Sequence, residues 1–155
     1  MTTVRAPYFE KPGAAEQPPP RTKAIILTVD DEPCISRVIQ LKLQNAGYDV
    51  VRASSGTEGL AKFTSLRPDI LITDVRMPGM SGIELCSRCE EYQGAWPFFI
   101  IVLTSQLDEE TQLWRQQDST RKYLSKPFSP REILRTVEEY LAARQTPDQR
   151  QEEPL

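Results

Sequence analysis

The chain has 155 residues, the usual size of one folded domain with short additional segments. Its formal net charge of −3 gives no positive field to attract nucleic acid or anionic lipid, so we expect neither direct nucleic-acid binding nor membrane association. The absence of histidine excludes histidine-dependent catalysis, histidine-ligated metals and a phosphohistidine carrier within this chain.

The sequence contains no recognisable membrane or export segment. No window approaches the ~18 apolar residues of a membrane span, and the N-terminal MTTVRAPYFEKPG lacks the apolar run of a signal peptide. We therefore expect a cytoplasmic protein. Three cysteines, an odd number, fit a reduced chain. Cys86 and Cys89 form a CxxC without a second pair, so we interpret them as small buried or half-buried thiols rather than zinc or redox groups, and Cys34 is the remaining cysteine.

Both ends of the chain differ in composition from its middle. Residues 1–22 hold five of the thirteen prolines and show no apolar periodicity, which predicts a disordered proline-rich tail. A plain tail is favoured there over a ligand for proline-recognition domains. Residues 144–155 are polar and are expected to be too short to fold. The predicted folded part is 23–143, and we expect no output domain to follow it.

Strands and helices alternate in the first half of the predicted core. The apolar run at 24–29 predicts a strand, and Pro33 begins a helix that Gly47 ends. A second strand at 48–53 is followed by a helix at 56–66. The first helix carries an apolar face that is expected to point inward: Ile35, Val38, Ile39, Leu43 and Ala46.

The alternation continues through the middle of the chain. A strand at 69–73 precedes a helix that begins with a capping box formed by Ser81 and Glu84. The next strand, 98–104, is the most apolar of the set. The inward residues of the helix between these strands are Ile83, Leu85, Cys86 and Cys89.

A weaker helix and a final strand and helix complete the predicted core. The helix at 108–118 has few apolar residues, and its Trp114 fits a binding anchor or a half-buried aromatic equally well. A short strand is expected at 122–125, and Ser129 with Glu132 forms a second capping box. The last helix has an inward stripe: Ile133, Leu134, Val137, Tyr140 and Leu141.

This order of elements predicts an α/β fold. Five strands alternating with five helices indicate a doubly wound parallel sheet covered on both faces, because parallel neighbours need right-handed crossover connections. The strands are continuous apolar runs, as expected for strands with two covered faces. In such folds the reactive groups gather beyond the carboxyl ends of the strands.

Polar side chains follow four of the five predicted strands directly. They are Asp30, Asp31 and Glu32 after the first, Asp74 after the third, Thr104 and Ser105 at the end of the fourth, and Lys126 after the fifth. Because these strand ends meet along one edge of a parallel sheet, we expect the side chains to form a common pocket.

The chemistry of these groups indicates phosphoryl transfer. Asp30, Asp31 and Asp74 repel one another when brought together, and oxygen ligands of this kind suit Mg²⁺. Lys126 supplies a positive charge and Thr104 a hydroxyl donor. Phosphoryl transfer needs a nucleophile, a metal ion and donors to the remaining charge. Asp74 is our choice of nucleophile.

Four motifs resemble one known family. The receiver (response regulator) domains of two-component signalling contain such motifs in the same order, and the resemblance covers about residues 23–143. It implies a flavodoxin-like, CheY-like sheet with strand order 2-1-3-4-5. The motifs in this chain are VDDEP (29–33), DVRMPGMSG (74–82), VLTS (102–105) and YLSKPF (123–128).

The resemblance implies a role for each acid. Asp74 would accept a phosphoryl group from the phosphohistidine of a sensor histidine kinase or a histidine phosphotransfer protein. Asp31 and Asp74 would bind one Mg²⁺ directly, together with the backbone carbonyl of Arg76. Asp30 would act on the ion through water. The resulting aspartyl phosphate would change a face that contacts an unknown downstream protein, or would be passed on in a phosphorelay.

The resemblance also implies a switch. Thr104 and Lys126 would bind the phosphoryl oxygens, and Tyr123 would turn inward as Thr104 moves toward the phosphate. The peptide bond before Pro127 would be cis, a form that costs only about 0.5–1 kcal/mol before proline.

The chain departs from the family pattern at several positions. Ser119 and Thr120 stand where family members commonly have Gly-Ala, so the end of the fourth helix is left open. Arg76 and Gln106 occupy positions that tune the lifetime of the phosphoryl group. Arg76 could shield the phosphate or recruit water, and the lifetime therefore stays open.

Two other functions are weighed against the receiver. A haloacid-dehalogenase-like phosphatase would form an aspartyl phosphate as a turnover intermediate, but it needs a second acid two residues after the nucleophile, where this chain has Arg76. We therefore expect no enzyme beyond catalysis of its own phosphorylation and dephosphorylation. A degenerate receiver used as a scaffold is disfavoured by the complete pocket. The cognate kinase, target, oligomeric state and role of the N-terminal tail are left open by the sequence.

Overall fold

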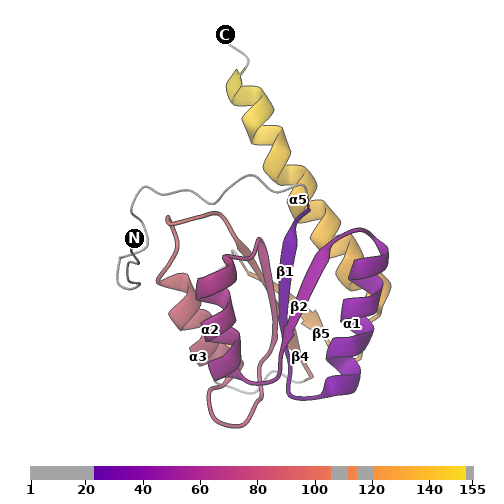
Figure 1. Cartoon of the computed structure of the whole chain (residues 1–155), viewed down its shortest axis with the longest axis vertical. Coiled ribbons are helices and arrows are strands. Elements are labelled where there is room, and N and C mark those ends of the chain that lie inside the picture. The colour runs from indigo at the N-terminus through magenta and orange to yellow at the C-terminus, as the bar shows by residue number, and fades with distance from the viewer. Residues whose placement is uncertain (1–22, 106–111, 115–120, 153–155) are drawn as a thin grey trace, which may run out of the picture.

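The computed structural model describes residues 23–105, 112–114 and 121–152, with side chains described up to residue 144. Five parallel strands form one sheet in the order β2-β1-β3-β4-β5, which confirms the expected topology (Figure 1). The strands are β1 (Ile25–Val29), β2 (Asp49–Ala53), β3 (Ile70–Asp74), β4 (Phe99–Thr104) and β5 (Lys122–Ser125). The helices are α1 (Pro33–Asn45), α2 (Gly56–Leu66), α3 (Gly82–Glu90) and α5 (Pro130–Glu152).

Helices cover both faces of the sheet. Figure 1 shows α2 and α3 on one side and α1 and α5 on the other. Along each strand the side chains alternate between the two sides, so that Leu27 packs toward α2 and α3 while its neighbour Ile26 packs toward α1 and α5. The central strands β1, β3 and β4 therefore bury both faces, which explains their nearly unbroken apolar sequence, whereas the edge strands β2 and β5 are partly exposed.

The core beneath α2 and α3 is rich in aromatic and sulfur-containing residues. Phe63 is fully buried, with its ring centroid 5.1 Å from that of Trp96. The indole Nε1 of Trp96 donates to the carbonyl of Pro68 at 2.9 Å, so the ring is both packed and hydrogen-bonded. Cys86 and Cys89 are buried as expected, whereas Cys34 is exposed.

The core beneath α1 and α5 is mainly aliphatic. Ile39 and Leu43 of α1 meet Ile133 of α5 and the facing side of the sheet. The predicted inward face of α1 was wrong at one edge, because Val38 is 47% exposed while Ser36 is buried. Ser36 satisfies its hydroxyl by donating to the carbonyl of Pro33, which makes burial of this small polar residue possible.

Serine caps fix the start of three helices. The hydroxyls of Ser55 and Ser81 accept the backbone N–H three residues later, and Ser129 accepts from Arg131 and Glu132. The helix starts expected from the capping patterns are therefore confirmed at Ser81 and Ser129.

The helix expected at 108–118 is only partly described, and helix α5 is longer than predicted. Residues 112–114 are helical, but the rest of the expected helix at 108–118 lies outside the described residues. Helix α5 continues to Glu152, so the prediction that residues 144–155 do not fold was wrong for most of them. Arg144 anchors the helix through an ion pair with Asp69 at 3.2 Å, and each later residue adds one helical hydrogen bond. Within the described ranges, no helix is both long and apolar enough for a membrane crossing.

Candidate functional site

Asp30 and Asp31 follow β1 directly and differ in exposure. Asp30 is only 2% exposed, and its Oδ1 accepts the backbone N–H of Glu32 at 2.8 Å. The other oxygen, Oδ2, has no hydrogen-bond partner in the described part of the chain. Asp31 is exposed. A buried carboxylate oxygen without a partner is costly, and it indicates that a bound cation or water completes the site.

Asp74 is the last residue of β3 rather than the residue after it. It is 7% exposed, its Oδ1 accepts the backbone N–H of Val75 at 2.9 Å, and the Nζ of Lys126 lies 3.1 Å from the same oxygen. The start of α3 lies against this backbone, since a Cβ on Gly82 would clash with the carbonyl of Asp74. Glycine at this position therefore lets the helix pack close to the Asp74 backbone.

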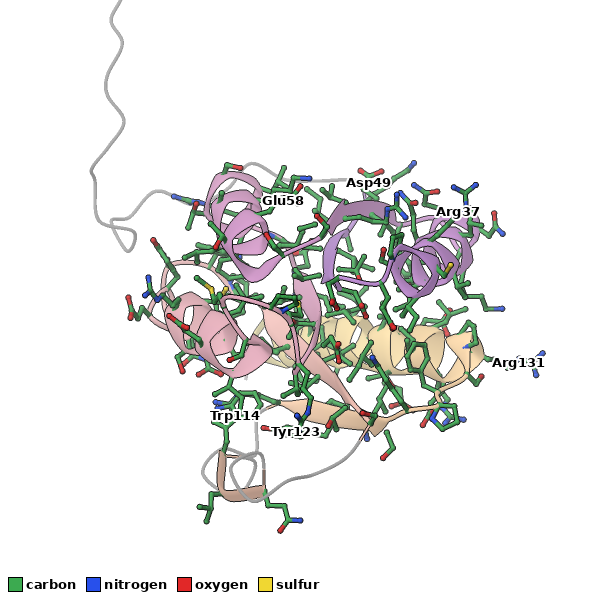
Figure 2. All side chains as sticks on the ribbon, turned by 90° about the horizontal axis from the view of Figure 1, so that it is seen from below. Arg37, Asp49, Glu58, Trp114, Tyr123 and Arg131 are labelled. Carbon is green, nitrogen blue, oxygen red and sulfur yellow. The ribbon has the colours of Figure 1, made fainter. Side chains whose placement is uncertain are left out.

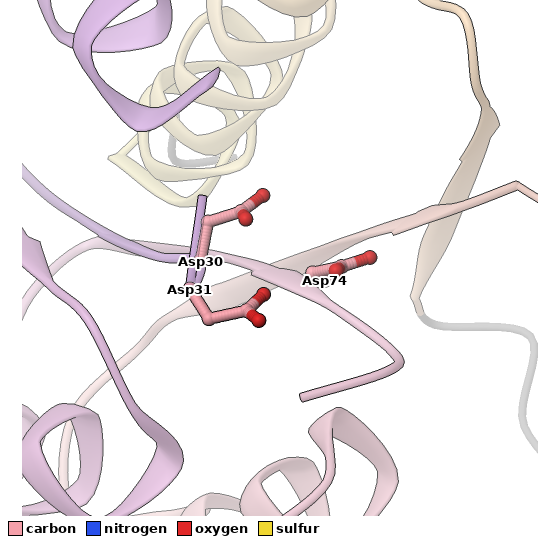
Figure 3. Close-up of side chains that lie close together, drawn as sticks. All are labelled: Asp30, Asp31 and Asp74. Atoms are coloured by element: carbon pink, nitrogen blue, oxygen red, sulfur yellow. The ribbon is translucent and has the colours of Figure 1, made fainter. Parts of the chain in front are cut away.

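The three acids converge. Carboxylate oxygens of Asp30, Asp31 and Asp74 lie within 4.8 Å of one another. Figure 3 shows all three side chains pointing to the same side of the strand ends. Oxygen ligands in this number suit a hard divalent cation such as Mg²⁺. The unpartnered oxygen of Asp30 is the observation on which this fit depends.

The electrostatics agree with a cation site. Burial raises the pKa of Asp30 to about 6, against the hydrogen bond from Glu32, and repulsion by Asp74 adds to the increase. Burial also raises the pKa of Asp74, although the hydrogen bond and charge of Lys126 oppose that effect. Both carboxyl groups therefore hold their protons more tightly than an exposed aspartic acid does. A bound cation would favour their charged forms.

Thr104 and Lys126 come from neighbouring strand ends. Thr104 is the last residue of β4, is 5% exposed, and lies opposite Ser125 of β5. The backbone N–H of Lys126 donates to the carbonyl of Thr104 at 2.8 Å, which holds the two chain segments together beyond the strands. The peptide bond between Lys126 and Pro127 is cis. The predicted site residues from β1, β3 and β5 are thus brought together, and Thr104 borders them.

The structure also gives the positions of Arg76, Tyr123 and Trp114, which the sequence had singled out. Arg76 is exposed in the segment between β3 and α3. Tyr123 is half-buried on β5, with its ring centroid 5.7 Å from that of Trp114 in an edge-on arrangement. Trp114 is 8% exposed, which makes it a buried aromatic in this structure. Gln106 and the departure at residues 119–120 lie outside the described residues.

Two contacts were missed from the sequence, one of Gly82 beside Asp74 and one of Arg121 directly before β5. Gly82 had a usable signal, because a glycine directly after a capping serine indicates close approach of the helix to another backbone. Arg121 had none. Its side chain is buried and binds Glu90, 31 positions earlier, so the contact exists only in the tertiary structure.

Comparison with known proteins is consistent with this geometry. The family described as response regulator receiver domain matches residues 26–138. The chain is 37% identical over 116 residues to the alkaline phosphatase synthesis transcriptional regulatory protein PhoP of Bacillus subtilis, a match that covers 75% of this chain and 48% of that protein. It is 35% identical over 109 residues to the phosphate regulon transcriptional regulatory protein PhoB of Pseudomonas aeruginosa, covering 70% and 48%. The chain thus spans about half the length of these curated relatives.

Solved structures show the same fold. The chemotaxis protein CheY4 of Vibrio cholerae is similar with a TM-score of 0.68 and 33% identity, over 76% of this chain and 98% of that one. A CheY-like receiver domain from Methanospirillum hungatei has a TM-score of 0.74 and 26% identity, over 81% and 98%. Together with the family match over 26–138, these findings show that the chain belongs to the response regulator receiver domains of two-component signalling.

Proposed function

We propose that Asp74 accepts a phosphoryl group from the phosphohistidine of a sensor histidine kinase or a histidine phosphotransfer protein. The observation that carries this proposal is the convergence of three carboxylates with Lys126, which lies 3.1 Å from Asp74. A buried carboxylate beside an ammonium group and further acids provides a nucleophile, a charge donor and ligands for a metal ion.

The proposed phosphoryl transfer is a direct displacement at phosphorus. A carboxylate oxygen of Asp74 attacks phosphorus, a P–O bond forms, and the P–N bond to the donor imidazole breaks with its electron pair returning to nitrogen. Lys126 and Thr104 border the position where the phosphoryl oxygens would lie and would donate to their negative charge. Val75 holds Asp74 in place through its backbone N–H.

Mg²⁺ is part of the proposal. Asp31 and Asp74 would hold the ion directly, with the backbone carbonyl of Arg76, and Asp30 would contribute through water. The ion would neutralise charge on the phosphoryl oxygens during transfer. The orphaned Oδ2 of Asp30 supports this assignment from the side of the protein.

The proposal extends to the role of the protein. It catalyses only its own phosphorylation and dephosphorylation and has no separate substrate, since Arg76 replaces the acid that a phosphatase of the haloacid-dehalogenase type needs. It acts in the cytoplasm through contact with a downstream protein or as a phosphorelay intermediate, without binding nucleic acid or membrane itself. Its negative net charge supports the last part.

Phosphorylation can be tested with a small donor. The protein is incubated with Mg²⁺ and acetyl phosphate, and the intact mass is compared for wild type, Asp74→Asn and the control Asp49→Asn. Asp49 is an exposed carboxylate on β2. We expect a single phosphoryl adduct on wild type and Asp49→Asn, and none on Asp74→Asn or in excess EDTA.

The same assay distinguishes the alternatives. Release of many equivalents of phosphate per protein would indicate a phosphatase. Failure of every donor to produce an adduct on wild type would indicate a scaffold. An adduct that persists in Asp74→Asn would place the acceptor elsewhere and would contradict the proposal.

A further inference from the structure

Arg121 lies in a buried cluster at the start of β5. Its side chain is only 5% exposed. The guanidinium binds the carboxylate of Glu90 through two hydrogen bonds, from Nε to Oε2 at 2.7 Å and from Nη2 to Oε1 at 3.0 Å. Glu90 is the last residue of α3. This two-point contact fixes the plane of the guanidinium, which a single contact would not do.

The rest of the guanidinium contacts the proposed switch residue. Its Nη1 donates to the hydroxyl of Tyr123 at 3.0 Å, and its Cζ lies 4.1 Å from the centroid of the Trp114 ring. Trp114 in turn meets Tyr123 edge-on, and Figure 2 shows the two labelled rings at the same edge of the molecule. Tyr123 is therefore held at its hydroxyl by Arg121 and at its ring by Trp114.

The charge on Arg121 is stable in this position. Burial alone lowers its pKa, but the hydrogen bonds to Glu90 and Tyr123 more than compensate, so the pKa is raised above its ordinary value. A buried guanidinium that loses a partner incurs a desolvation cost, so the three groups resist separation.

We propose that Arg121 is a positioning residue that holds Tyr123 in the place it occupies while Asp74 is unmodified. Displacement of Tyr123 must break the hydrogen bond from Arg121, and the contact with Glu90 prevents the guanidinium from following. The resting state is thereby favoured. This inference rests on the proposed function, in which Tyr123 responds to phosphorylation of Asp74.

The resting protein provides a test that needs no phosphorylation. Tyrosines are replaced by 3-fluorotyrosine, and the ¹⁹F resonance of Tyr123 is assigned with Tyr123→Phe. We expect Arg121→Gln to introduce exchange broadening at Tyr123. The control Arg88→Gln breaks the exposed pair between Arg88 and Glu84 on α3 and should leave that resonance unchanged. An unchanged Tyr123 resonance in Arg121→Gln would overturn the proposal, whether or not Asp74 accepts phosphate.

A double-mutant cycle separates positioning from general stability. Proteins labelled with 5-fluorotryptophan are titrated with beryllofluoride, a phosphoryl analogue, in Mg²⁺, and the Trp114 resonance reports displacement of Tyr123. We expect Arg121→Gln and Tyr123→Phe each to lower the midpoint about tenfold, as loss of a hydrogen bond from a charged donor implies. The double variant should show no further decrease. Additive effects would show that Arg121 does not act through the tyrosine hydroxyl and would overturn the proposal.

A second variant serves if Arg121→Gln does not fold. Arg121→Gln leaves the carboxylate of Glu90, with a side chain 19% exposed, without its cation. If that variant unfolds, Glu90→Gln combined with Arg121→Gln removes both charges and supports the same two measurements. If wild type forms no adduct with acetyl phosphate, the proposed function fails, while the resting-state measurement still decides the role of Arg121.

Discussion

Replacing Asp30 by asparagine should stabilise the metal-free protein. Asp30 is 2% exposed, and burial raises its pKa from 3.8 to about 6. At about 1.4 kcal/mol per tenfold change in proton affinity, the ionised group costs up to about 3 kcal/mol of folding free energy at pH 7. Asparagine keeps the acceptor for the N–H of Glu32 and removes the buried charge beside Asp74.

The sign of the pH effect follows from the raised pKa. The folded state binds the Asp30 proton more tightly than the unfolded state, so stability is greatest below about pH 4 for this group and is lost as the pH rises through about 6. Metal-free wild type should therefore become more stable between pH 7 and pH 5, with a smaller gain in Asp30→Asn. Glu58 acts in the opposite direction only at lower pH, since its pKa is lowered to about 2, chiefly by the hydrogen bond from the backbone N–H of Ser54.

Urea unfolding in EDTA, followed by far-UV circular dichroism, measures both effects. At pH 7 the midpoint of Asp30→Asn should lie up to roughly 1–3 M above that of wild type, using a typical dependence of about 1–3 kcal/mol per molar urea. The exposed control Asp49→Asn should change little. Added Mg²⁺ should stabilise wild type more than Asp30→Asn. An asparagine variant no more stable than wild type in EDTA would refute the reasoning.

Three further substitutions test other parts of the structure. Lys126→Met should slow formation of the phosphoryl adduct on the order of 100-fold in an intact-mass time course, because one charged donor is lost; an unchanged rate would exclude that role. Gly82→Ala should lower the free energy of unfolding by about 1–3 kcal/mol in thermal denaturation, since the added methyl group clashes with the Asp74 carbonyl, whereas Ser87→Ala on the exposed side of α3 should not. Asp69→Asn should cost about 1–3 kcal/mol by weakening its contacts with Ile25 and Arg144, measured by urea unfolding; no loss would mean that these contacts contribute nothing net.

The sheet and its pocket were predictable because their signals are local. The central strands β1, β3 and β4 are nearly continuous apolar runs, and Asp30 and Asp74 lie at or directly beyond the end of such a run, while Lys126 directly follows the short strand β5. The parallel topology then brings these residues together without further information. The boundary error at β3 was one residue, since Asp74 still pairs within the sheet, opposite Leu103.

The contacts that were not predictable depend on tertiary packing. The periodicity of α1 did not distinguish Val38 from Ser36, because both positions border the same apolar stripe and only the approach of α5 and the sheet decides which is covered. In the sequence, Arg121 is a charged residue directly before the strand predicted at 122–125. Only the folded chain shows that Arg121 turns inward to meet Glu90.

The distribution of aromatic side chains has a consequence for spectroscopy. Trp96 and Trp114, the only tryptophans of the chain, both belong to the core beneath α2 and α3. Tryptophan fluorescence therefore reports on the core beneath α2 and α3 and is insensitive to most changes in the aliphatic core beneath α1 and α5. If α1 or α5 loosened first, emission would stay constant while ellipticity fell, and the two curves would separate along the denaturant axis.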